Sequence, residues 1–337
     1  KLKTMHEVYP FKFEPIYKEK IWGDQKLNTV LNKDIPKDKK IGESWEVSAV
    51  QGDTSVVKNG YLAGNSLQEL LEVYMGDIVG EQLYEIYGIE FPLLIKFIDA
   101  TDVLSIQVHP DDELAKKRHK AFGKTEMWYV VQADEGAELI SGFNREMDKA
   151  TYLKHLNNNT LPEILNNEKV KAGDVFFLPS GRVHAIGAGI LLAEIQQTSD
   201  ITYRIFDWNR KGADGKPREL HTDLAVDAID YKYYGKYRTD YEAEKNKSSN
   251  LVNCEYFTIN LFEFDQEVEK DWIATDSSVI YMCLHGKAEL EYDEEERVAI
   301  EAGESLLVPA SIDHLKYIPR NYAKMLEVYI DIEQNND

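Results

Sequence analysis

One spacing occurs twice in this chain and limits the folds that it can adopt. In residues 173–184 a glycine, a proline and a histidine are separated by five and four residues, and residues 303–314 repeat the same spacing. Similar segments precede the two copies, EGAELI at 135–140 and HGKAELE at 285–291. Glycine permits a tight hairpin turn and proline is tolerated at a strand end, so the repeat predicts a duplicated β unit. A polar stretch with helical spacing, 144–167, lengthens the first copy.

Short strand patterns dominate the rest of the chain. Runs rich in β-branched and aromatic residues predict strands at 43–50, 91–99, 103–109 and 127–133, and again from residue 170 onward. Outside the insertion, helical spacing is confined to 66–80 and 111–122. The sequence therefore predicts a mostly β fold with helical insertions.

A polar stretch interrupts the strand patterns at 241–250, where apolar residues become rare. This change in composition predicts a domain boundary. We expect a first domain over residues 1–240, which contains the N-terminal strands and the helical insertions, and a second domain over residues 250–337.

The balance of charge restricts the partners of this chain. Its 60 acidic and 39 basic residues give a formal net charge of −21, which repels nucleic acid and anionic lipid. No run of about 18 apolar residues is present, so no membrane span is predicted. Two cysteines are too few for a disulfide framework or a cysteine-based zinc site, and a cytoplasmic location is expected. An anionic substrate would need positive charge from the pocket itself, supplied by arginine, lysine or a metal.

Four side chains form a candidate metal site. Gln107 and His109 lie two apart in a predicted strand, so both side chains point to one face of the sheet. Glu126 begins the next strand, and His184 ends the hairpin of the first repeat. Two imidazoles, a carboxylate and an amide oxygen suit a divalent metal and leave coordination positions open. From spacing alone, hydrogen-bonded polar residues near strand ends are an equally good interpretation.

These residues also carry a family resemblance. The pattern Gly-x5-Pro-x-Gly-x2-His at 173–184 is similar to the second motif of the cupin superfamily. LSIQVHPDDELA at 104–115, GKTEMWYV at 123–130 and TSDITYR at 198–204 together resemble the type I mannose-6-phosphate isomerases (phosphomannose isomerases) in their short bacterial form. The resemblance implies a double cupin, with two jelly-roll-like β-barrel units, of which the second lacks a metal site.

The resemblance also implies roles for single residues. It implies one zinc ion per chain, with Gln107, His109, Glu126 and His184 as its ligands.

The implied catalytic residues are Lys124, Asp200 and Arg204, and Lys124 and Arg204 are also the implied substrate contacts. Glu194 follows a strand pattern of the buried type and is a further candidate for substrate binding, with a place in the core or behind the site an equally good interpretation. The chain departs from the family at Gly123, where many members have a histidine, so no proton transfer by that histidine is possible here.

The implied reaction interconverts mannose 6-phosphate and fructose 6-phosphate through a cis-enediol(ate). Removal of a proton next to the carbonyl is the difficult step, and a metal with open positions would stabilise the oxyanion that develops. The sequence leaves both Lys124 and Asp200 open as the base, whereas Arg204 is expected to bind the phosphate because a guanidinium presents a planar fork. The expected partner is a small sugar phosphate, without nucleic acid or membrane, and the chain is expected to be a monomer or a homodimer.

Two other functions remain open at this point. A metal-dependent oxygenase on the same barrel usually carries histidine-rich ligands, and Gln107 argues against it. The second is a sugar-phosphate-binding protein without activity, and the presence of the whole ligand set together with Lys124 and Arg204 argues against it. Oxygen uptake would identify the first of these functions, and binding without turnover would identify the second.

Overall fold

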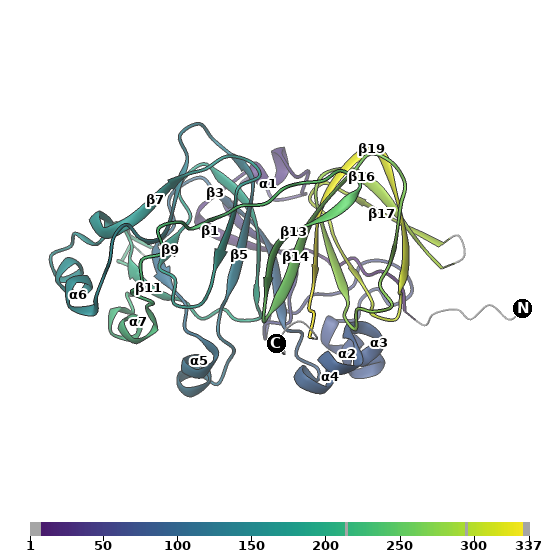
Figure 1. Ribbon diagram of the computed structural model, residues 1–337, viewed down its shortest axis with the longest axis horizontal. Coiled ribbons are helices and arrows are strands. Elements are labelled where there is room, and N and C mark those ends of the chain that lie inside the picture. The colour runs from purple at the N-terminus through teal and green to yellow at the C-terminus, as the bar shows by residue number, and fades with distance from the viewer. Residues whose placement is uncertain (1–7, 213–214, 294–295, 333–337) are drawn as a thin grey trace, which may run out of the picture.

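The structure, a computed structural model, describes residues 8–212, 215–293 and 296–332. Its strands outnumber its short helices, which confirms the prediction of a mostly β fold. Two β units lie side by side along the longest axis of the molecule (Figure 1). The helical elements are α1 (Lys26–Thr29), α2 (Leu67–Tyr74), α3 (Gly76–Val79), α4 (Glu81–Tyr87), α5 (Asp112–His119), α6 (Lys149–Asn157), the 3-10 helix η1 (Leu161–Ile164) and α7 (Thr222–Ala228).

The first unit contains two sheets that face each other. One has the strand order β1-β2-β3-β10-β5-β8-β12, and the other has the order β11-β4-β9-β6-β7. Apolar side chains from both sheets fill the space between them, among them Trp128, Phe176 and Leu139. The strands are β1 (Ile16–Asp24), β2 (Ile41–Val47), β3 (Leu93–Ala100), β4 (Ile106–Val108), β5 (Glu126–Ala133), β6 (Glu138–Phe143), β7 (Leu165–Lys169), β8 (Val175–Leu178), β9 (His184–Ala185), β10 (Ile190–Gln197), β11 (Tyr203–Phe206) and β12 (Arg238–Thr239).

The second unit contains one large, strongly bent sheet. Its strand order is β13-β14-β19-β16-β17, with β15 paired to β19 and β18 paired to β16. A separate apolar core lies inside it, with Phe262, Tyr281 and Tyr317 fully buried. The strands are β13 (Lys247–Cys254), β14 (Phe257–Phe264), β15 (Val268–Asp271), β16 (Val279–Tyr292), β17 (Glu296–Glu301), β18 (Ser305–Val308) and β19 (His314–Tyr329).

The repeat seen in the sequence corresponds to a repeat in strand pairing. In the first unit β5 pairs with β8 and β10, and in the second unit β16 pairs with β18 and β19 in the same arrangement. The insertion at 144–167 is helical only in α6 and η1, because residues 165–167 already pair with β6 as the start of β7. The duplicated β unit is therefore observed, and the insertion is shorter than predicted.

Two predicted helices are also shorter than expected. The helix predicted at 66–80 breaks at Met75, whose φ of 46° lies in the left-handed region, so α2 and α3 are separate. The helix predicted at 111–122 ends at His119, because Lys120 is left-handed and ends the hydrogen-bonding ladder.

The polar stretch at 241–250 overlaps a strand. Residues 247–250 belong to β13, which pairs with β14 alone among the described strands and therefore forms an edge of the sheet. An edge strand with one face toward solvent can be polar, which explains the composition of this stretch. The division of the chain into domains at 240–250 stays a prediction.

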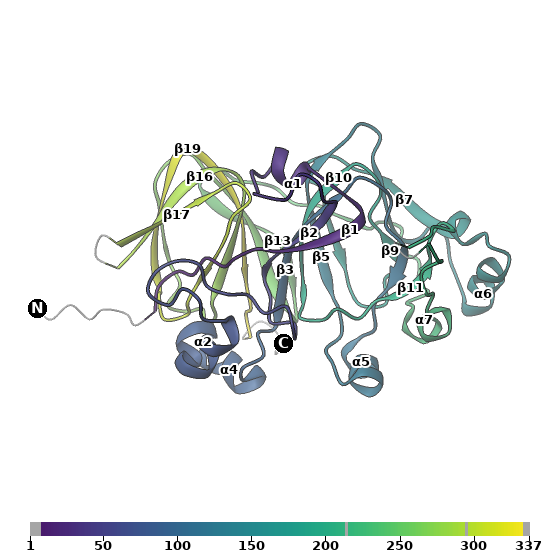
Figure 2. The ribbon, with the colours of Figure 1, turned by 180° about the vertical axis from the view of Figure 1, so that it is seen from behind.

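The N-terminal part of the chain connects the two units. Phe11 and Leu307 exchange two backbone hydrogen bonds, of 2.8 and 2.9 Å, so the segment before β1 pairs with β18 of the second unit. The helices α2–α4 also lie against the second unit (Figure 2), where the Ala310 amide donates to the Ile78 carbonyl at 2.9 Å. One apolar core contains side chains from both units, including Phe97 and Val328.

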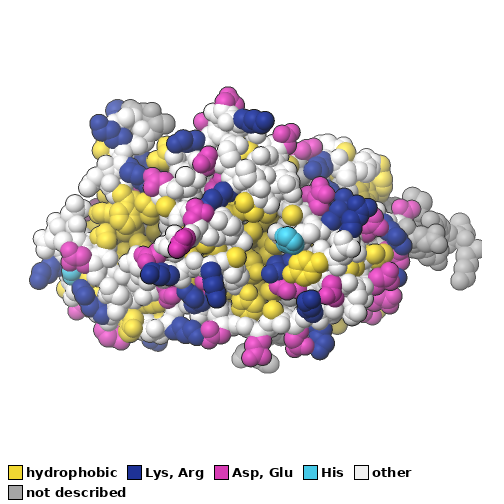
Figure 3. Space-filling model, turned by 90° about the horizontal axis from the view of Figure 1, so that it is seen from above, with side chains coloured by type: hydrophobic (Ala, Val, Ile, Leu, Met, Phe, Trp, Pro, Cys, Tyr) yellow, Lys and Arg dark blue, Asp and Glu magenta, His cyan; other side chains and the backbone are white. Residues whose placement is uncertain are grey.

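The charged side chains and the lengths of the helices bear on the contacts that the molecule can make. Figure 3 shows acidic and basic side chains interspersed over one face of the molecule, so the net charge of −21 is not gathered into a single patch there. Within the described ranges, every helix is too short or too polar to cross a bilayer.

Candidate active site and metal centre

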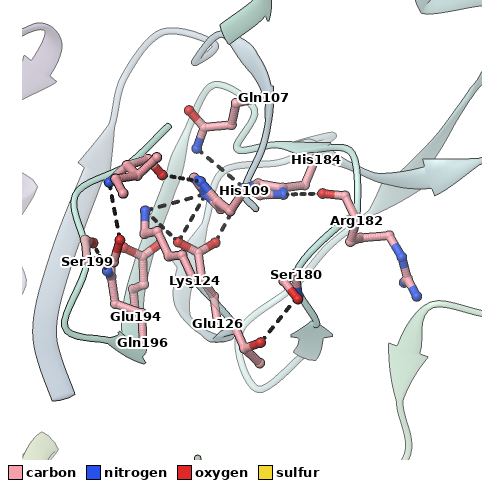
Figure 4. Close-up of polar contacts among 12 residues, drawn as sticks. Gln107, His109, Lys124, Glu126, Ser180, Arg182, His184, Glu194, Gln196 and Ser199 are labelled. Carbon is pink, nitrogen blue, oxygen red and sulfur yellow. Dashed lines mark hydrogen bonds and ion pairs between the residues drawn. The ribbon is translucent and has the colours of Figure 1, made fainter. Parts of the chain in front are cut away.

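The four predicted metal ligands meet at one end of the first unit. Gln107 lies in β4 opposite His184, the first residue of β9, and His109 directly follows β4. Glu126 is the first residue of β5 and lies opposite Gln196 of β10. Because these strand ends face each other across the two sheets, the four side chains point toward one centre (Figure 4).

The geometry of this cluster fits a divalent metal ion. Ligand atoms of His109, Glu126 and His184 all lie within 4.8 Å of one another, and all three side chains are buried. Glu126 Oε1 is 3.4 Å from His109 Nε2, and Glu126 Oε2 is 3.3 Å from His184 Nε2. Both carboxylate oxygens are fully buried, and Oε2 accepts no hydrogen bond from the described residues, whereas Oε1 faces the Lys124 ammonium. A buried oxygen without a donor is costly, and coordination to a metal would remove that cost.

Backbone carbonyls fix the orientation of both imidazoles. His109 Nδ1 lies 2.9 Å from the Ile201 carbonyl oxygen, and His184 Nδ1 lies 2.8 Å from that of Arg182. A carbonyl can only accept, so each Nδ1 carries the proton and each Nε2 presents its lone pair to the centre. Gln107 Nε2 lies 3.3 Å from His184 Nε2, and a half rotation of the amide would bring the oxygen there instead.

The electrostatics of the cluster favour the ligating protonation states. Burial and the neighbouring Lys124 lower the pKa of His109 to about 3, and burial lowers the pKa of His184. Burial opposes the charge on Glu126, but the Lys124 ammonium outweighs it and holds the pKa of Glu126 well below its usual range. Neutral histidines and an ionised carboxylate are the forms that bind a metal.

Lys124 lies inside the cluster. Its ammonium is 2.8 Å from Glu126 Oε1 and 3.4 Å from His109 Nε2, and its side chain is only 6% exposed. A cation therefore already faces the buried carboxylate, within reach of any molecule bound at the centre.

Arg204 lies beside the cluster, in β11, opposite Gln107. Its side chain is half-buried, and its Nε and Nη1 lie 3.3 Å from Ser105 Oγ and 2.9 Å from the Glu219 carbonyl oxygen. Burial and the nearby Arg218 guanidinium lower the pKa of Arg204.

Two more arginines surround Arg204 and are held by one carboxylate. Arg210 Nη2 donates to Asp207 at 2.7 Å, and Arg218 donates to the same carboxylate from Nε, also at 2.7 Å. Three guanidinium groups therefore lie close together around one buried aspartate, with Asp102 also 3.5 Å from Arg210 and Glu219 near Arg204.

The other two predicted site residues lie in different surroundings. Asp200 is exposed and makes no hydrogen bond or ion pair with the part of the chain that the structure describes. Glu194 is buried, and both of its oxygens are occupied, by Lys96 Nζ at 3.0 Å and by Trp128 Nε1 at 2.7 Å. The structure thus brings Glu194 near the centre and leaves Asp200 at the surface.

Lys96 is a buried charged residue beside Glu194 that sequence reasoning missed. Its ammonium contacts Glu194 and, at 2.6 Å, Gln196 Oε1, and it lies 5.2 Å from the centre of the Trp45 ring. A signal for it was present, because Lys96 is the only basic residue within the apolar strand pattern at 91–99. A lysine in a strand buried on both faces requires a partner.

Comparisons with known proteins agree with this site. The family description "Phosphomannose isomerase type I, catalytic domain" matches residues 10–139, and "Mannose-6-phosphate isomerase, cupin domain" matches residues 247–317. Mannose-6-phosphate isomerase ManA of Bacillus subtilis is 40% identical over 256 residues, which are 74% of this chain and 78% of that protein. The mannose-6-phosphate isomerase of Streptococcus mutans is 35% identical over 87% of this chain and 90% of that protein.

A solved structure supports the same conclusion. The crystal structure of the mannose 6-phosphate isomerase from Bacillus subtilis superposes with a TM-score of 0.86 at 32% identity, over 96% of this chain and 100% of that one. The predicted double-cupin fold is thereby confirmed. This chain belongs to the type I mannose-6-phosphate isomerase family and is an isomerase of that kind.

Proposed function

We propose that this chain interconverts mannose 6-phosphate and fructose 6-phosphate with one zinc ion and through a cis-enediol(ate). The observation that carries the proposal is the buried carboxylate of Glu126 between two imidazoles, whose Nε2 atoms face it at 3.4 and 3.3 Å. Gln107, His109, Glu126 and His184 would hold the ion. Bound there, zinc would polarise an oxygen on C1 or C2 of the open-chain sugar and favour the oxyanion that forms when the neighbouring proton leaves.

Lys124 is the group that we assign to proton movement. Its ammonium lies at the centre of the cluster, 2.8 Å from Glu126 Oε1. In that position Lys124 Nζ can hold or deliver a proton at the sugar oxygens. Asp200, the other candidate for the base, is exposed and lacks any contact with the four ligands within the described ranges. The geometry therefore favours Lys124 over Asp200.

Arg204 is the group that we assign to the phosphate. Its guanidinium lies on the strand next to Gln107, where the positive charges of Arg210 and Arg218 add to its own. A planar guanidinium binds phosphate oxygens in pairs. This arrangement supplies the local positive charge that an anionic substrate needs on a chain of net charge −21. Glu194 contributes to substrate binding indirectly in this proposal, by holding Lys96 at the wall of the site.

The metal requirement is tested by chelation. Fructose 6-phosphate formed from mannose 6-phosphate is followed in a coupled assay before chelation, after chelation and after zinc is added back. We expect turnover to disappear and to return with zinc. Full activity of the chelated protein, verified to be free of metal by elemental analysis, would contradict the zinc assignment and leave the family membership intact.

The role of Lys124 is tested against Asp200. We expect Lys124→Met to lower kcat by about 100-fold or more, since general acid–base groups contribute about that much. Asp200→Asn should retain kcat within a few fold. The opposite order of effects, in steady-state kinetics at saturating zinc, would assign the proton transfer to Asp200.

The cluster itself is tested at Glu126. Glu126→Gln should lower zinc affinity, measured by competition with a chromophoric chelator, together with activity. A severe loss of activity with unchanged zinc binding would count against Glu126 as a ligand. The cytoplasmic location and the monomeric or homodimeric state stay predictions.

A further inference from the structure

The carboxylate of Asp112 contacts the backbone of the segment that carries Lys124 and Glu126. Asp112, in the first turn of α5, accepts three hydrogen bonds. The Gly123 amide donates to Oδ1 at 2.7 Å, Gln197 Nε2 donates to the same oxygen at 3.1 Å, and the Tyr256 hydroxyl donates to Oδ2 at 2.6 Å. We refer to Asp112, Gln197 and Tyr256 as the Asp112 cluster.

The Asp112 cluster fixes the backbone of residues 123–126. Gln197, held by Asp112, accepts a hydrogen bond from the Thr125 amide at 2.9 Å through Oε1. A Cβ on Gly123 would lie 2.6 Å from the backbone at the start of α5, so only glycine permits this approach. The Gly123 and Thr125 amides flank Lys124, so their hydrogen bonds decide where the Lys124 side chain leaves the backbone.

One member of the cluster comes from the second unit. Tyr256 lies in the turn between β13 and β14, while Asp112 and Gln197 belong to the first unit. Tyr256 is half-buried and packs against the apolar core that both units share. Burial and the contact with Asp112 raise the pKa of Tyr256, so its hydroxyl keeps its proton and donates it to the carboxylate.

We propose that Asp112 and Tyr256 are positioning residues of the isomerase, through which the second unit holds the segment that carries Lys124 and Glu126. The second unit thereby contributes to catalysis without any metal ligand of its own. The proposal rests on the proposed function, since it requires that Lys124 and Glu126 act in the reaction. The hydrogen bond from Tyr256 to Asp112 should be strong, because a hydrogen bond to a carboxylate is about twice as strong as one between neutral groups.

The test compares two tyrosine hydroxyls. Tyr256→Phe removes the bond to Asp112 and keeps the ring in the core. Tyr241→Phe is the matched control, because Tyr241 is also half-buried and its hydroxyl donates at 2.7 Å to the Gly173 carbonyl, near the end of β5 opposite Glu126. For Tyr256→Phe we expect kcat per bound zinc to fall about tenfold, with KM changed less than twofold. Tyr241→Phe should keep both values.

A second readout does not depend on turnover. In metal-free protein, the Gly123 and Thr125 amides should exchange with solvent faster in Tyr256→Phe than in Tyr241→Phe, because the carboxylate that holds them is less constrained. Asp112→Ala removes all three bonds and should lower kcat further, and the double variant Asp112→Ala/Tyr256→Phe should be no worse than Asp112→Ala alone, since the Tyr256 hydroxyl then has no carboxylate to lose.

Several results would overturn the proposal. Equal kcat per bound zinc in Tyr256→Phe and Tyr241→Phe would do so, as would equal exchange rates of the two amides. Reductions of kcat by Asp112→Ala and by Tyr256→Phe that multiply in the double variant would also overturn it. Failure of the proposed function is distinguishable, because it appears in the wild-type protein as turnover that survives metal removal, whatever Tyr256→Phe does.

Discussion

Lys96 provides the sharpest test of how the interior of the first unit is held together. Its side chain is 8% exposed, and its ammonium lies 3.0 Å from Glu194 Oε1. It also acts on a second carboxylate, because burial opposes the charge on Glu43 but Lys96 and Lys20 outweigh it and lower the pKa of Glu43 to about 2. Lys96→Met removes the charge while keeping most of the side-chain volume.

The expected magnitude follows from the burial of both partners. Removing one member of a buried ion pair costs about 3–5 kcal/mol, because an uncompensated charge remains in the interior. Glu194 would retain only its hydrogen bond from Trp128. Glu194→Gln added to Lys96→Met removes that stranded charge, so the double variant should be less destabilised than the single one. We expect a coupling free energy of about 2 kcal/mol or more between the two changes.

Urea unfolding of metal-free protein at neutral pH measures these values, and chelation keeps metal binding out of the free energy. Lys96→Met, Glu194→Gln and the double variant complete the cycle with the wild type. Free energies of unfolding that add within about 0.5 kcal/mol would refute the reasoning, since they would mean that the two side chains act independently.

Three further predictions concern other parts of the fold. Arg204→Gln should raise KM for mannose 6-phosphate about tenfold or more in steady-state kinetics, and an unchanged KM would contradict its contact with the phosphate. Burial raises the pKa of Asp99 to about 6, so stability is lost as pH rises through that value. Asp99→Asn, which keeps an acceptor for the Lys26 amide, should therefore raise the free energy of unfolding by about 1 kcal/mol near pH 8 and by less near pH 5; equal urea midpoints for the two proteins at both values would contradict it. A Cβ on Gly187 would lie 1.6 Å from the Glu138 carbonyl oxygen, so Gly187→Ala should destabilise by about 2 kcal/mol or more in thermal unfolding, and an unchanged Tm would refute the clash.

The meeting of the four candidate ligands at one centre could be predicted from local sequence together with the family resemblance. Gln107 and His109 share one face through the period of a strand, and the turn before His184 is determined by its glycines and proline. Exposure could not be predicted in the same way. Asp200 lies four residues before Arg204, yet its side chain is exposed at the surface. Whether a loop residue turns inward depends on contacts that no local pattern encodes.

Side-chain contacts between segments far apart in the chain could not be predicted from the sequence. Asp112 and Tyr256 are 144 residues apart, and only the packing of the two units brings them together. The same holds for Lys96 and Glu194, which are 98 residues apart and meet through the register of β3 and β10. A pattern can indicate that a buried lysine needs a carboxylate, but the pairing of strands selects which one.

The second unit shows which parts of the site are dispensable for the fold. Its pairing places Val279 where the first unit has Glu126, since Val279 lies opposite Val308 as Glu126 lies opposite Leu178. His314 keeps the spacing of the repeat but is exposed. In the part of the second unit that the structure describes, no group of side chains could hold a metal. A β unit of this kind therefore forms without such a cluster, and the cluster in the first unit is not a requirement of the fold.

A buried carboxylate and its cation persist where the metal ligands do not. Glu327 lies opposite Tyr281 in the second unit as Glu194 lies opposite Trp128 in the first. Glu327 is fully buried, pairs with Lys270 and accepts from Ser248 Oγ at 2.8 Å. Since this pair exists in a unit without a metal site, a carboxylate at this position has a structural role of its own. The pairing of Glu194 with Lys96 should then stabilise the first unit whether or not zinc is bound. The free energies of unfolding of metal-free Lys96→Met, Glu194→Gln and the double variant measure this stabilisation in the absence of zinc.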